Sequence, residues 1–200
     1  RFGASLEKIK QVVEPRPGEI MFGLNLVVHK GKTIFVADTS VHEYPTSEQM
    51  AEIAISSARV VRLFGFDPKV AFVSHSTFGQ PITSRTKHIK KAVDILKEKN
   101  VNFEFDGDMQ PDVALNKEYK NLYPFSNIVG SANILIMPGQ HSAAISYKMM
   151  KELGDTKVIG PLLIGLGLPI EIAPLRTSTS ELINLASIAA YSADVIDYKK

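Results

Sequence analysis

The residues best suited to chemistry in this 200-residue chain lie in the loop Ser74–Gly79, which combines hydroxyl side chains with a glycine. An apolar run, Val70–Val73, precedes the loop, and Pro81 follows it at the predicted start of a helix. A strand, such a loop and a helix start often bind a phosphate group in α/β proteins. The loop is neither a Walker A sequence nor the Gly-x-Ser-x-Gly of a nucleophile elbow. It is therefore either an anion-binding site or an ordinary turn whose hydroxyls bond to the backbone.

A cluster of carboxylates, Asp106, Asp108 and Asp112, follows the next predicted strand. An Asp-x-Asp pair can supply the nucleophile of a phosphatase-type site. Met109 and Gln110, however, stand where that site needs Gly-Thr, and the spacing also differs from an EF-hand. The pattern favours turn and capping roles for these carboxylates over metal or phosphatase chemistry.

The histidines and the late glycines carry weaker signals. None of the five histidines falls in a metal-ligand spacing. We expect His75 and His141 at the same edge of the sheet, each either a proton-transfer group or a hydrogen-bonded loop histidine. Gly165 and Gly167 lack the third glycine of a dinucleotide-binding fingerprint, which favours a packing or turn role.

Alternating strands and helices must position these residues. Two β-rich runs flank the turn residues Lys30–Lys32 and predict a hairpin. Thr46 and Gln49 form a capping-box pattern before a run of helical periodicity that stops at Gly65. Further helices are expected from Pro81 to Asn100, through residues 140–150 and over 178–193, with short strands within 70–73, 101–106, 133–138, 157–167 and 169–175.

This alternation predicts a three-layer α/β fold, a mostly parallel sheet with helices on both faces. Ligands of such sheets bind outside the carboxyl ends of the strands. Four loops are expected there, and they are Ser74–Gln80, Asp106–Asp112, Gly139–Ser142 and Leu175–Ser180.

Composition narrows the function classes. A net charge of +2 argues against a nucleic-acid binder, and the basic group Arg85, Lys87, Lys90 and Lys91 fits the exposed face of a helix. Without Cys there is no disulfide framework or thiolate nucleophile, which fits a reducing cytoplasm.

The longest apolar region, residues 158–168, is broken by glycines and Pro161 and is too short to span a bilayer. The chain begins with Arg1 rather than Met and has no signal peptide, so we expect a segment of a longer cytoplasmic protein.

Five segments occur in order along the chain: FVADTSVHEYPTSEQMAEIAISSAR, PKVAFVSHSTFGQP, FEFDGDMQPDVAL, ANILIMPGQHSAAISYKMM and IGPLLIGLGLPIEIAP. Together they resemble the phosphate acetyl/butyryl transferase family. The YPFS segment, Tyr123–Ser126, and the STFG form of the loop are similar to the branch fused to bacterial NADP-dependent malic enzymes. The resemblance implies an isocitrate-dehydrogenase-like phosphotransacetylase fold of two subdomains. Residues 20–200 would supply the second subdomain and the C-terminal helix, and residues 1–19 a linker or the remnant of an upstream subdomain.

Transferases of this family move an acetyl group between CoA and phosphate. The resemblance implies a Ser-Arg pair and, soon after it, an Asp: the Asp accepts the thiol proton, the Ser steadies the transition state and the Arg holds phosphate. Here Arg176 takes the place of the arginine, whereas Leu175 and Leu182 stand where the Ser and the Asp belong, and Glu152 replaces a further arginine. Leucine can neither accept a proton nor donate a hydrogen bond, and a glutamate repels phosphate. The resemblance therefore implies an inactive transferase site with no catalytic residue.

What remains is a binding role. The resemblance implies a regulatory and oligomerisation region of an NADP-dependent malic enzyme, binding acetyl-CoA or a related acyl-CoA or acyl phosphate but no metal of its own. We expect the ligand at Ser74, Ser76, Thr77, Gly79, Arg176 and Ser178. NADP and Mg or Mn would serve the malate chemistry of the parent protein, which we expect to be a homo-oligomer without nucleic-acid or membrane partners.

Two alternatives stay open. One is a working phosphate acetyltransferase fragment in which Ser178 or Ser180 substitutes in the site and Glu181 is the base. The other is a structural oligomerisation module whose cleft binds nothing.

Overall fold

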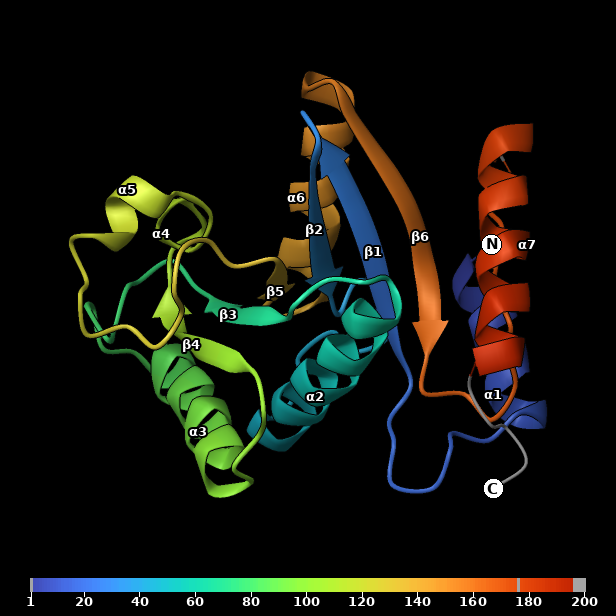
Figure 1. The fold of residues 1–200 in the computed structure, drawn as a ribbon. Helices are drawn as coiled ribbons and strands as arrows, with labels where there is room; N and C mark the ends of the chain where they lie inside the picture. The colour runs from blue at the N-terminus through green and yellow to red at the C-terminus, as the bar shows by residue number, and fades with distance from the viewer. Residues whose placement is uncertain (1, 176, 196–200) are drawn as a thin grey trace.

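The computed structural model describes residues 2–175 and 177–195, in which one six-stranded sheet carries helices on both faces (Figure 1). The strands lie in the order β4-β3-β5-β2-β1-β6. Their bounds are β1 Phe22–His29, β2 Lys32–Ala37, β3 Lys69–Val73, β4 Glu104–Met109, β5 Ile134–Ile136 and β6 Thr156–Ile164. The helices are α1 Phe2–Val12, α2 Ser47–Leu63, α3 Ser84–Glu98, α4 Pro111–Leu115, α5 Lys117–Lys120, α6 Gln140–Leu153 and α7 Thr179–Val195. In this described part of the chain, no helix has the length and apolar character needed to cross a bilayer.

The sheet has a parallel half and an antiparallel half. β4, β3, β5 and β2 are parallel neighbours, whereas β1 pairs antiparallel with both β2 and β6. β1 and β2 form the predicted hairpin, which turns at Lys30 and Gly31, both with positive φ. Since three of the five neighbouring pairs are parallel, the predicted mostly parallel sheet with helices on both faces is confirmed.

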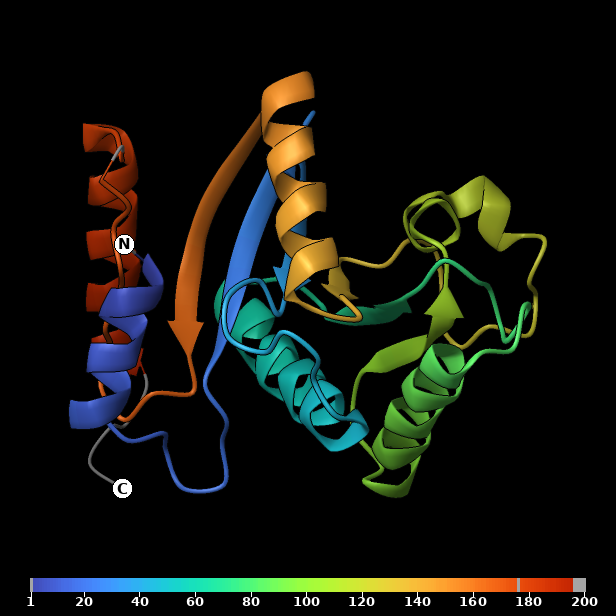
Figure 2. The same ribbon diagram turned by 180° about the vertical axis from the view of Figure 1, so that it is seen from behind.

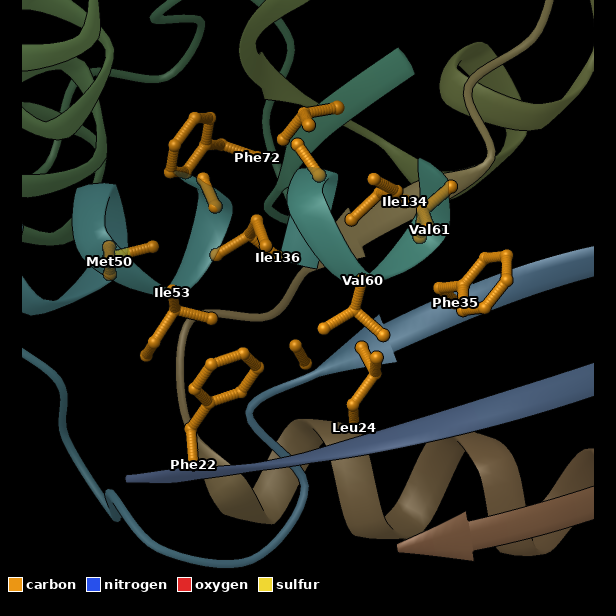
Figure 3. Packing of buried hydrophobic residues seen from close by; sticks show 14 of the residues in the cluster. Phe22, Leu24, Phe35, Met50, Ile53, Val60, Val61, Phe72, Ile134 and Ile136 are labelled. Carbon is orange, nitrogen blue, oxygen red and sulfur yellow. The ribbon is translucent and has the colours of Figure 1, made fainter. Parts of the chain in front are cut away.

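Alternation of side chains along the strands builds a core on each face of the sheet. Phe35 and Phe72 belong to the core beneath α2 and α3 (Figure 3). Their neighbours Val36 and Ala71 face the other way, into a core that includes α4 and the start of α6. The sheet is thus buried on both faces where its strands run parallel, and its loops are left to form the functional edge.

Side-chain caps decide where the two central helices begin. α2 has the predicted capping box: Thr46 Oγ1 accepts from the Gln49 N–H at 3.1 Å and Gln49 Oε1 accepts from the Thr46 N–H at 2.8 Å. Thr83 and Thr86 form a second capping box, which places the start of α3 at Ser84. The predicted start at Pro81 was wrong, because the Thr83 cap fixes the first turn three residues further on.

α1 and α7 both lie at the β6 end of the sheet (Figures 1 and 2), and Leu185 of α7 belongs to the same apolar cluster as Leu162 of β6. A third apolar cluster, which includes Leu6, Met21 and Leu163, joins α1 to this edge. The strand predicted over residues 169–175 is absent from the described structure: Pro169 and Pro174 have no N–H to donate to a ladder, and the segment runs outside the sheet. The boundary predicted at residue 20 stays a prediction.

Candidate functional site

A cleft of about 650 Å³ opens at the carboxyl ends of β3 and β5, the edge where the sequence predicted a site. Its wall combines the end of β3, the start of α3 and the start of α6. Three of the four predicted loops contribute to it, whereas none of the described residues of the fourth, Leu175 and 177–180, lines it. The polar lining residues are Glu43, Tyr44, Ser74, His75, Arg85, His141, Ser142 and Ser146.

The buried carboxylate of Asp38 holds one wall of this cleft. Asp38 Oδ1 accepts from the N–H groups of Gly23, Ser40 and Val41 at 2.9, 2.8 and 3.1 Å. Its Oδ2 accepts from the N–H of His42 and contacts the His42 Nδ1, both at 2.7 Å. Asp38 carries no recognisable motif, and only its place directly after β2 could have drawn attention to it.

The start of α6 is tied to the same wall. Its Gln140 N–H donates to the His42 carbonyl at 3.2 Å, and Gln140 Nε2 donates to the Ser40 carbonyl at 3.1 Å. A Cβ on Gly139 would collide with the Glu43 carbonyl oxygen, so glycine is needed for this close approach. The two hydrogen bonds of Gln140 and the close approach at Gly139 hold the N-terminal end of α6, a 14-residue helix, at the cleft.

The loop Ser74–Gly79 folds around a carboxylate of the protein itself. Asp108 accepts from the Ser76 hydroxyl and from the Gly79 N–H, the latter at 2.9 Å. Thr77 Oγ1 accepts from the Gln110 N–H at 3.2 Å. Of the four predicted ligand residues in this loop, Ser74 lines the cleft, whereas Ser76 is fully buried. Asp108 thus occupies two of the donors that the sequence assigned to an external anion, the Ser76 hydroxyl and the Gly79 N–H.

The predicted carboxylate cluster therefore has a structural role. Asp106, like Asp108, binds a neighbouring segment: its Oδ2 accepts from the Ser126 hydroxyl and the Asn127 N–H, both at 2.8 Å. Asp112 Oδ1 accepts from the adjacent Val113 N–H at 3.0 Å, at the start of α4. Within residues 2–175 and 177–195, no three His, Asp or Glu side chains are grouped as a metal site would need.

The cleft is suited to an anion. Arg85 lies 4.7 Å from the centre of the Tyr44 ring, and α6 adds the positive end of its dipole. His141 is 3.4 Å from the Glu43 carboxylate. The Nδ1 of His75 is 3.5 Å from the Ser74 Oγ, longer than the roughly 2.6–3.2 Å expected of an activated serine. This arrangement favours binding over nucleophilic catalysis.

The positions that resemblance ties to acetyl transfer lie elsewhere, where α6 ends and α7 begins. Ser178 and Glu181 cap α7: Glu181 Oε2 accepts from the Ser178 N–H at 2.8 Å and from its hydroxyl at 2.9 Å. These bonds hold the pKa of the Glu181 carboxyl below its usual value, and Lys151 lies 3.3 Å away. Leu175 is 99% exposed and Leu182 46% exposed.

The structure does not join the two groups of predicted ligand residues. α7 stands beyond β6, at the opposite end of the sheet from β3, and Ser178 does not line the cleft (Figure 1). Arg176, the other residue predicted on this side, lies outside the described residues.

Known proteins with similar sequences and structures identify the family of this chain. The sequence profile of the family described as phosphate acetyl/butaryl transferase matches residues 2–190. An NADP-dependent malic enzyme of Rhizobium meliloti (strain 1021) is 45% identical over 96% of this chain, and a phosphate acetyltransferase of Clostridium acetobutylicum is 32% identical over 92%. The matches cover 25% of the malic enzyme and 58% of the acetyltransferase, so the chain spans about a quarter of the length of the former.

Structural comparison leads to the same family as the sequence comparisons. A solved phosphotransacetylase from Streptococcus pyogenes superposes with a TM-score of 0.91 at 29% identity, over 97% of this chain and 60% of that one.

Proposed function

This chain belongs to the phosphate acetyl/butyryl transferase family, and from that premise we propose that it is a regulatory and oligomerisation region that binds acetyl-CoA without transferring its acetyl group. The observation that carries this proposal is the start of α7. There the carboxylate of Glu181 caps its own helix, and Leu175 and Leu182 supply neither a base nor a hydroxyl.

Acetyl transfer needs a group that removes the thiol proton from CoA. Glu181 is a poor candidate, because the Ser178 bonds lower the pKa of its carboxyl and so weaken it as a base. Glu152, exposed near the end of α6, adds negative charge where the family resemblance implies an arginine for phosphate. The weak basicity of Glu181 and the negative charge of Glu152 both favour a domain that has the phosphotransacetylase fold but does not catalyse acetyl transfer.

The parent protein, on this proposal, is a cytoplasmic homo-oligomeric malic enzyme that converts malate to pyruvate and carbon dioxide. Support comes from the malic enzyme of Rhizobium meliloti, which matches nearly the whole chain. NADP and Mg or Mn would supply hydride acceptance and carbonyl polarisation. We assign both to the rest of the parent, because this chain matches only a quarter of the malic enzyme.

The cleft beside Ser74 is our candidate for the acetyl-CoA site. Its volume of about 650 Å³ is in the range of small-molecule sites, and Arg85 and the α6 N-terminus favour phosphate groups. Regulation through this cleft requires acetyl-CoA to bind two states of the enzyme with different affinity.

Calorimetric titration of acetyl-CoA into the full-length protein tests this proposal. We expect saturable binding that Arg85→Ala weakens by about tenfold, as expected for the loss of a charge-assisted contact. Arg176→Ala tests the retained family arginine in the same way. Arg62→Ala is the matched control, because Arg62 bonds to Asn102 outside the cleft. No binding to the full-length protein would leave a purely structural module.

A transferase remains the second candidate, favoured by the hydroxyl–carboxylate contact between Ser178 and Glu181. Turnover of acetyl phosphate and CoA separates the two functions. Activity that disappears in both Ser178→Ala and Glu181→Gln would establish the transferase, and we expect none.

A further inference from the structure

A second cavity, of about 510 Å³, lies on the other side of the Ser74–Gly79 loop from the cleft. Its walls are one face of α3, the β4 edge strand and the segment around Phe125, with α3 beside β4 as in Figures 1 and 2. The cleft and this cavity share no lining residue. It is therefore a separate place to bind a ligand.

Three lysines of α3, namely Lys87, Lys90 and Lys97, line this cavity. The lining spans Thr86 to Lys97, about 16 Å along a helix, which suits an extended ligand better than one small ion. Lys97 pairs with Asp94 at 3.3 Å, whereas no ion pair is found for Lys87 or Lys90 among the described residues. An ammonium group without a carboxylate partner is well placed to receive a phosphate.

Aromatic rings line the same cavity as the lysines. Phe78 and Phe125 both line it, and their ring centres are 4.8 Å apart. Phe125 is 66% exposed, which is unusual for a large apolar ring in contact with two others. Phe78 has a φ of 50°, a left-handed conformation that costs free energy in a bulky residue. Strain of this kind concentrates at binding sites, and here it places a ring at the cavity.

Acceptors and an amide complete the lining. Asp106 and Asp108 already hold neighbouring N–H and hydroxyl groups, yet a carboxylate has about four acceptor positions and can take a further donor. Asn127 offers both a donor and an acceptor beside Phe125. An aromatic ring that carries an amino group satisfies these residues, and a simple inorganic anion does not.

From this combination we infer that the cavity binds an adenine nucleotide, with its phosphates on the α3 lysines and its base at Phe78 and Phe125. A base stacks on an aromatic side chain, and the exocyclic amine of adenine donates to a carboxylate or amide oxygen. The same chemistry occurs in a free nucleotide and in the nucleotide end of CoA. The case of a free nucleotide does not depend on the proposed function, whereas the case of the nucleotide end of CoA rests on it.

Calorimetry on the full-length protein at low salt, with ADP as the probe, tests the inference. We expect one saturable site per chain, with pyrophosphate and adenosine each binding at least about tenfold more weakly, since each keeps only half of the contacts. Lys90→Ala and Phe125→Ala should each weaken ADP by about tenfold, and both side chains are exposed enough to be removed without unfolding the domain. Lys91→Ala is the matched control, because the neighbouring Lys91 pairs with Glu48 at 2.6 Å, outside the cavity.

Three outcomes would overturn the inference: no saturable ADP binding, equal affinity for pyrophosphate alone, or the same loss in Lys91→Ala as in Lys90→Ala. Competition separates the two sources of the nucleotide. If acetyl-CoA displaces ADP one for one and Lys90→Ala weakens both, the cavity holds the nucleotide end of CoA. If ADP still binds under saturating acetyl-CoA, the cavity holds a free nucleotide.

Discussion

Two buried aspartates organise the functional edge of this domain at the scale of single residues. The Asp38 carboxylate accepts hydrogen bonds from N–H groups beside one cleft wall. The Asp108 carboxylate accepts hydrogen bonds from the Ser74–Gly79 loop. Hydrogen bonds to a charged acceptor contribute about 1.5–3 kcal/mol each, and a buried donor left unpaired costs a similar amount. Asp38 thus fixes the residues that directly follow it and joins them to Gly23 of β1, whereas Asp108 holds a loop that lies about 30 residues earlier in the chain.

Asp108→Ala tests this role. The Ser76 hydroxyl and the Gly79 N–H lose their acceptor, so we expect the loop amides of Phe78 and Gly79 to exchange with solvent on the order of a hundredfold faster. Hydrogen–deuterium exchange of the full-length protein measures this change. Asp112→Ala is the control, because that carboxylate contacts only its neighbour Val113 in the described structure. Equal exchange in the two variants would contradict the assignment.

At the scale of elements, α7 depends on its cap more than the central helices do. Leu185 is the one buried residue of α7, whereas α2 has ten buried residues. Packing therefore holds α2 even if its capping box is weakened, but α7 relies on the hydrogen bonds that Ser178 and Glu181 exchange.

Ser178→Ala should consequently loosen the first turn of α7. The expected loss is about 1 kcal/mol, which corresponds to roughly fivefold faster amide exchange over that turn. Ser180→Ala serves for comparison, since its side chain makes no hydrogen bond within residues 177–195. If Ser180→Ala loosened the turn as much as Ser178→Ala, the capping role of Ser178 would be wrong.

At the scale of the whole molecule, local sequence patterns predicted the helices, strands and turns. The arrangement of the site depends on contacts between residues far apart in the chain, which these patterns could not predict. The Lys30–Lys32 turn and the Thr46–Gln49 capping box could be recognised because their partners are adjacent in the chain. The bond from Ser76 to Asp108 joins positions 32 residues apart, and no local pattern marks it. For the same reason the lysines of α3 resembled an ordinary exposed face: the opposite wall of their cavity comes from residues 125–127.

The junction between β6 and α7 carries a pH dependence that belongs to the molecule as a whole. Glu171 is mostly buried there and accepts from the Leu163 N–H at 3.1 Å. Burial raises the pKa of its carboxyl from the usual 4.5 to about 8, because the charged form loses its water. Above pH 4.5 the unfolded chain therefore releases a proton that the folded chain retains. Stability falls with each pH unit until the folded carboxyl also ionises near pH 8.

Glu171→Gln removes this titration and keeps an oxygen for the Leu163 N–H. From the shift between 4.5 and about 8, we expect the variant to exceed the wild type in stability by roughly 3 kcal/mol at pH 7 and by about 1 kcal/mol or less at pH 5. Denaturant unfolding of both proteins, followed at each pH through the transition that includes this domain, gives the difference directly. A gap that stays the same from pH 5 to pH 8 would mean that Glu171 is ionised in the folded protein. In that case a charged carboxyl, and not a protonated one, would accept from the Leu163 N–H at the junction of β6 and α7.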